Sequence, residues 1–153
     1  MKLFLTLLLN FFVYNTYSQT NDIIFISFHH QNSIVVNSEI DIYFYQDFRE
    51  QKFYINVKTA KFEKQYFVSN EKAANLINIV SKISAIDIIQ DVRNCLDGSD
   101  TEITVSKSFL SQNTVTYSVN CLSSEDEKTP WKDYFKAVNL ILDLAQLKFS
   151  DLE

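Results

Sequence analysis

The sequence has very little of the residues on which many catalytic and binding motifs depend. Its 153 residues include one glycine, one proline, two cysteines and two histidines. A single glycine cannot build a glycine-rich phosphate loop, and two histidines leave little material for a catalytic triad. The motifs G-x-S-x-G, H-E-x-x-H and C-x-x-C are also missing. These absences favour a protein without enzymatic activity and without a cofactor, although they leave an enzyme working through carboxylates as an alternative.

Long apolar runs are missing as well, except at the N-terminus. Lys2 precedes the apolar run Leu3–Val13, which is well short of the roughly 20 residues that span a bilayer. A more polar stretch follows, with small residues one and three positions before Gln19. This pattern is typical of a secretory signal peptide. We therefore predict a signal peptide over residues 1–18, a single domain over residues 19–153, and a secreted or periplasmic location.

The charge pattern limits the choice of partner. The formal net charge is −5, and it becomes more negative when the predicted signal peptide, with its one lysine, is removed. A mildly acidic chain with scattered lysines gains little from phosphate backbones, so nucleic acid is not an expected partner. Residues 49–72 carry an excess of basic side chains and residues 87–102 an excess of acidic ones. Such a bipolar surface suits an encounter with another protein.

The two cysteines predict one disulfide. An even number of cysteines in an exported chain is typical of structural pairing, and Cys95 and Cys121 are too far apart for a C-x-x-C redox motif. Closing a loop of this length is worth roughly 3–4 kcal/mol in the chain-entropy description.

Alternating and β-branched residues predict five to six strands. The expected strands of the N-terminal half are 23–28, 34–45, one around 53–58, and 62–68. Two more are expected around residues 103–105 and 115–119, after a turn at the only glycine, Gly98. Cys95 and Cys121 bracket that hairpin.

Two segments change to a helical period. Apolar residues at helical spacing between 73 and 83 predict a helix capped by Ser69 or Asn70. Thr129-Pro130 predicts the start of a second helix, with the threonine as N-cap. Its expected apolar face consists of Trp131, Tyr134, Phe135, Val138, Ile141, Leu142 and Ala145. The order ββββ-α-ββ-α predicts an α+β domain in which two helices pack on an antiparallel sheet of five to six strands.

Histidines and acidic residues were also considered as candidate site residues. Adjacent residues of a strand point to opposite faces, so His29 and His30 are not expected to share a metal ion. Our interpretation is two solvated loop histidines, and no metal site is predicted. Asp97, Asp100 and Glu102 surround the glycine turn without the spacing of a calcium loop, so we interpret them as a hairpin entrance.

Three tyrosines give the more specific prediction. Tyr43, Tyr45 and Tyr54 lie out of phase with the apolar residues of their strands, which places them on the other face of the sheet. Tyrosine recurs at protein interfaces because it combines a rigid ring with a polar tip. We predict that these residues bind another protein, unless a helix or the N-terminal segment covers them.

The functional hypothesis is therefore a small exported binding or interaction protein, similar in role to an inhibitor or an immunity protein. The alternative is a small extracytoplasmic hydrolase that uses carboxylates such as Asp97, Asp100 or Glu102. Neither the partner nor the oligomeric state follows from the sequence.

Overall fold

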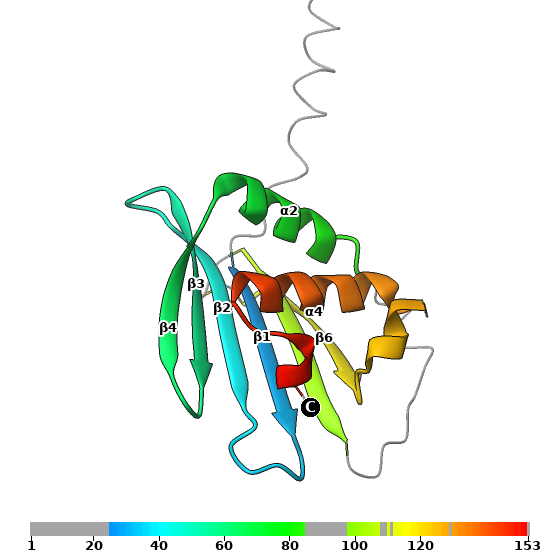
Figure 1. The fold of residues 1–153 in the computed structure, drawn as a ribbon. Coiled ribbons are helices and arrows are strands. Elements are labelled where there is room, and N and C mark those ends of the chain that lie inside the picture. The colour runs from blue at the N-terminus through cyan, green and yellow to red at the C-terminus, as the bar shows by residue number, and fades with distance from the viewer. Residues whose placement is uncertain (1–24, 85–97, 108–109, 111, 129, 153) are drawn as a thin grey trace, which may run out of the picture.

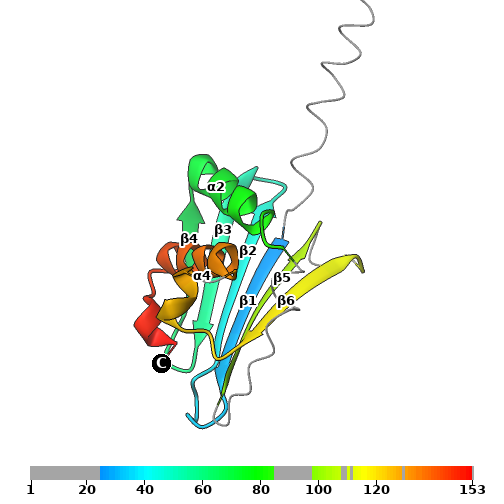
Figure 2. The same ribbon diagram turned by 90° about the vertical axis from the view of Figure 1, so that its right-hand side faces the viewer.

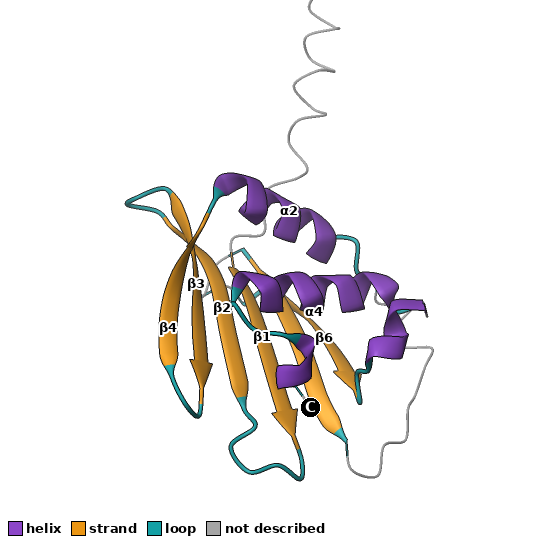
Figure 3. Ribbon diagram, in the orientation of Figure 1, coloured by secondary structure: helices purple, strands orange, loops and turns teal. Residues whose placement is uncertain are grey.

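A computed structural model describes residues 25–84, 98–107, 110, 112–128 and 130–152 (Figure 1). The described strands form one antiparallel sheet in the order β4-β3-β2-β1-β5-β6. The strands are β1 (Phe25–Asn32), β2 (Ile40–Asp47), β3 (Lys52–Thr59), β4 (Glu63–Val68), β5 (Ser99–Ser106) and β6 (Thr114–Asn120). The helices are α2 (Asn70–Val80) and α4 (Lys132–Leu144), with short 3-10 turns η1 (Ser124–Lys128) and η2 (Phe149–Asp151). The predicted α+β architecture and the order ββββ-α-ββ-α are confirmed (Figure 3).

Both helices pack on the same face of the sheet, as the side view in Figure 2 shows. The core lies between these two layers because every second strand residue points toward the helices. Ile42, Phe44 and Ile55 are each at most 1 % exposed. On the helical side, all seven residues of the predicted apolar face around α4 are buried. We call this the inner face of the sheet, and the opposite one the outer face.

The second strand begins later than the sequence predicted. β2 starts at Ile40, whereas the apolar residues from Ile34 onward predicted an earlier start. The reason is the turn chemistry of Asn32, whose side-chain carbonyl accepts hydrogen bonds from the backbone N–H groups of Ile34 (3.0 Å) and Val35 (3.3 Å). Asn37 also adopts a left-handed backbone with φ of 65°. These local bonds turn the chain and lengthen the β1–β2 connection.

The helix starts show one correct and one wrong prediction. The Ser69 hydroxyl accepts from the backbone N–H of Lys72, so Ser69 is the N-cap of α2 as predicted. The prediction for α4 was wrong, because that helix begins at Lys132 and its N-cap is Trp131, which makes no side-chain capping bond. The Trp131 ring is buried in the core, which fixes the start of this helix by packing. Thr129 lies outside the described residues.

Cys121 directly follows β6, and its backbone N–H donates to the carbonyl of Ser99 over 2.7 Å. Its predicted partner Cys95 lies outside the described residues, so the disulfide stays a prediction. None of the helices in the described part of the chain has both the length and the apolar character that a membrane span requires.

Candidate functional site

The outer face of the sheet gathers most of the residues that the sequence singled out. Strand register arranges its side chains in rows across the sheet. The first row is Phe67, Tyr54, Tyr45, Phe25, Ser106 and Thr114; the second is Gln65, Asn56, Tyr43, Ser27, Thr104 and Thr116; the third is Glu63, Lys58, Asp41, His29, Glu102 and Ser118. On β1 to β4 the face therefore changes along the strands from mainly aromatic, through amide and hydroxyl, to charged side chains.

Five rings at neighbouring strand positions form the aromatic cluster, which we define as Phe25, Tyr43, Tyr45, Tyr54 and Phe67. The ring centroids of Tyr45 and Tyr54 are 6.1 Å apart, and those of Tyr54 and Phe67 are 6.2 Å apart in an edge-to-face arrangement. Phe25 stacks on Tyr43 at 6.3 Å. The tyrosines are half-buried against these neighbours, whereas Phe67 is 61 % exposed. The rings are thus held in place while part of their surface stays open.

Hydrogen bonds fix two of the phenol groups. The Tyr54 hydroxyl donates to a Glu50 carboxylate oxygen over 2.9 Å, and the Tyr45 hydroxyl accepts from the Gln65 amide over 2.6 Å. The bond to Glu50 is the main reason that the pKa of Tyr54 is raised. The same bond, followed by the contact with Lys52, lowers the pKa of Glu50. At pH 7 this edge of the cluster therefore presents a neutral phenol bound to an ionised carboxylate.

The three predicted tyrosines therefore lie together on one face, away from both described helices. Their rings are less solvated than the prediction assumed, because they pack on one another and on two phenylalanines that it missed. Phe25 and Phe67 were the missing members. Phe25 was assigned to the first strand without a face, and Phe67 lies in β4, whose alternation is irregular.

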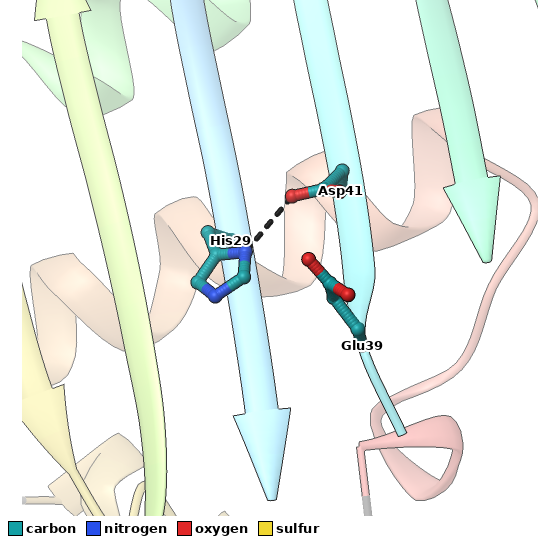
Figure 4. A group of neighbouring side chains, drawn as sticks. All are labelled: His29, Glu39 and Asp41. Atoms are coloured by element: carbon teal, nitrogen blue, oxygen red, sulfur yellow. Dashed lines mark hydrogen bonds and ion pairs between the residues drawn. The ribbon is translucent and has the colours of Figure 1, made fainter. Parts of the chain in front are cut away.

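At the charged end of the outer face, His29 meets two carboxylates (Figure 4). His29 Nδ1 lies 2.8 Å from Asp41 Oδ1 across the β1–β2 pair. Glu39 precedes β2, two residues before Asp41, so that it points to the same face. One potential ligand atom from each of the three residues lies within 4.8 Å of the other two. Burial, followed by the charges of Asp41 and Glu39, raises the pKa of the neighbouring Tyr43.

His30 lies on the inner face, which corrects the interpretation of both histidines as solvated loop residues. Both lie within β1, and His30 is 1 % exposed. Its Nε2 is 2.9 Å from the carbonyl of Leu152, which has no hydrogen to give, so Nε2 donates. Neutral Nδ1 then accepts from the Thr101 hydroxyl at 2.9 Å. Burial is the main cause that lowers the pKa of His30. The expectation that adjacent histidines face opposite ways is confirmed.

Two hollows on the surface are lined by residues other than the acids proposed for a hydrolase. One hollow of about 320 Å³ lies between the start of β2 and η2, where Glu39, Lys61 and Asp151 contribute to its walls. A second hollow is lined by residues 31–39. Asp100 and Glu102 lie instead on β5, and Asp97 lies outside the described residues.

Comparisons with known proteins add no relative. The chain matches no protein-family model, no curated protein and no solved structure. The class of the protein is therefore defined by its own fold, a two-layer α+β domain with helices on one face of a six-stranded antiparallel sheet.

Proposed function

We propose that this protein is a small exported binding protein that holds a partner protein on the aromatic cluster of its outer face. The observation that carries the proposal is the cluster itself, in which rings from four adjacent strands pack side by side on the face away from the helices. Large rings gathered on an exposed surface usually mark a contact site.

The arrangement of the rings supports tight binding. Aromatic side chains supply most hot spots at interfaces, and they do so best when little conformational freedom is lost on binding. Here each tyrosine ring already packs on a neighbour, and the phenol groups of Tyr45 and Tyr54 already hold hydrogen-bond partners. Phe48, 59 % exposed in the β2–β3 turn, extends the apolar surface at the same end of the sheet. A complementary partner therefore carries an apolar patch with hydrogen-bonding groups at its rim.

The proposal includes export and the disulfide as predicted from the sequence. An exported domain of this size gains stability from a covalent link between the start and the end of the β5–β6 hairpin.

The test is a pull-down from the native envelope fraction, followed by titration of the purified partner that is recovered. The bait variants are the double change Tyr43→Ser with Tyr54→Ser and the single change Phe67→Ser. We expect each to weaken binding about tenfold or more, as for aromatic hot spots. Val115→Ser is the control, because Val115 is also an exposed apolar residue, at 50 % against 61 % for Phe67, and lies on the opposite edge strand away from the cluster. This control should bind like the wild type.

Two outcomes would contradict the proposal. One is equal affinity for the wild type and the Phe67→Ser variant, since that residue is the most open ring of the cluster. The other is binding of an envelope polysaccharide in the absence of any protein.

A further inference from the structure

We infer that His29, Glu39 and Asp41 form a binding site for a zinc-class divalent cation at the charged end of the outer face. The site is separate from the aromatic cluster, so its test does not depend on the proposed function. The argument starts from the three side chains, which come from two adjacent strands and point to one face (Figure 4).

The donor set distinguishes this group from an ordinary patch of acids. One imidazole nitrogen and two carboxylates are ligands that zinc accepts, and three protein ligands plus one open position is the usual arrangement of a reactive zinc site. A purely acidic group would favour calcium or magnesium, which take oxygen ligands and do not use imidazole.

The distances require only a small adjustment. Ligand atoms in a tetrahedral site with bonds near 2.1 Å lie about 3.4 Å apart. His29 Nδ1 and Asp41 Oδ1 are closer than that, at 2.8 Å, and the widest separation within the group stays inside 4.8 Å. Glu39 is exposed, and none of the described residues forms an ion pair or side-chain hydrogen bond with its carboxylate, so it is free to move inward.

Metal binding at Nδ1 also requires His29 to change its tautomer, so that the ring hydrogen is on Nε2. The short contact with Asp41 implies that Nδ1 carries the hydrogen in the metal-free protein. When a metal ion takes the Nδ1 lone pair, the neutral ring carries its hydrogen on Nε2, which points away from both carboxylates in Figure 4. The carboxylate of Asp41 then changes from hydrogen-bond acceptor to ligand.

The electrostatic surroundings favour a cation. Glu102 lies beside His29 in the register with β5, and Asp100 is exposed two residues before it. The basic residues near the group are Lys58, opposite Asp41 on β3, and Lys61, which lines the same hollow as Glu39. Acidic residues therefore outnumber basic ones around the site, and a bound cation relieves the repulsion between Glu39 and Asp41.

The experiment is a calorimetric titration of the purified protein with zinc chloride alone, repeated with calcium chloride. We expect one saturable zinc site with Kd below roughly 100 µM, and weaker binding of calcium. Removing one ligand through His29→Gln or Glu39→Gln should weaken zinc binding at least about tenfold, given that losing even an outer-shell partner has such an effect. Glu63→Gln is the matched control, because Glu63 is an exposed acid of the same face outside the group; it should leave zinc binding unchanged.

A second readout keeps the inference testable if a variant folds poorly. The wild-type protein contains only two histidines, so their imidazole NMR signals can be followed separately. Zinc should shift the signals of His29 and leave those of His30, which is buried and bonded through both nitrogens. The inference is wrong if His29 signals do not move, if His29→Gln binds zinc as well as the wild type, or if calcium binds equally well.

Discussion

Replacing the buried His30 should show how much its hydrogen bonds, which connect the segment after η2 to the sheet, contribute to the free energy of unfolding. His30 joins the Thr101 hydroxyl on β5 to the carbonyl of Leu152 beyond η2, and Tyr134 of α4 donates to the Thr101 carbonyl over 2.7 Å. In a His30→Leu variant, both partners of the ring lose their hydrogen bonds in a dry environment. Each buried group without a partner costs about 1–3 kcal/mol, so the free energy of unfolding should fall by roughly 2–6 kcal/mol.

A double-mutant cycle with Thr101→Val separates the bond from general packing. Valine removes the hydroxyl with little change of shape, so His30→Leu should cost less in the Thr101→Val background than in the wild type. Urea melts of the four proteins give the coupling free energy. A coupling free energy near zero would refute the bonding arrangement, and a loss below about 1 kcal/mol for His30→Leu would show that the site is not buried.

The same residue predicts a pH dependence. Burial lowers the pKa of His30 below its ordinary value of 6.5, so below that pH the unfolded chain binds a proton that the folded protein does not. Its contribution is complete above about pH 6.5 and decreases as the pH falls toward the folded pKa, by at most about 1.4 kcal/mol per pH unit. Urea melts across this range should show the decrease in the wild type and a smaller one in His30→Leu. Identical pH profiles would contradict the prediction.

Three further predictions concern processing, the cysteines and a helix cap. Mass spectrometry of protein recovered from outside the cytoplasm should show a chain that begins at or near Gln19; a chain retaining Met1 would contradict export. Non-reducing peptide mapping should link Cys95 to Cys121, and reduction should lower the free energy of unfolding by roughly 3–4 kcal/mol, whereas two free thiols would exclude the bond. Ser69→Ala should destabilise the protein by about 0.5–1 kcal/mol in a urea melt. This is the low end for N-caps, because the hydroxyl oxygen accepts from the backbone N–H of Lys72 over a long distance of 3.4 Å. An unchanged midpoint would show that the cap contributes nothing.

Periodicity was sufficient to predict the architecture. In β2, β3 and α4 the spacing of the apolar residues indicates which positions are buried, because one face of each element packs on the core. The strand and helix ends were less predictable. Asn32 and Asn37 turn the chain through side-chain hydrogen bonds and a left-handed backbone, neither of which a hydrophobic pattern records.

The candidate sites also divide into a part that periodicity predicts and a part that it does not. The shared face of the three tyrosines follows from alternation alone. The approach of His29 to Asp41 depends on the pairing register, which shifts when the end of a connection is misplaced. Because the sequence predicted an earlier β2, Asp41 and Glu39 had no fixed position relative to β1. The alternation of Glu39, Asp41 and Tyr43 was nevertheless the signal that could have placed both carboxylates on the outer face.

The central position of β1 has a consequence for how the protein is made. β1 pairs with β5 across 81 residues, from Phe25 to Ser106, and His30 reaches Leu152 across 122 residues. β1 is the first described strand to be synthesised, but its hydrogen bonds are complete only when β5 and Leu152 have also been synthesised. Pairing between such distant segments slows folding. For a protein that we propose to be exported, this delay is useful. In the export that we propose, slow closure of the core would leave the chain unfolded for longer, which is the state that passes through a translocation channel.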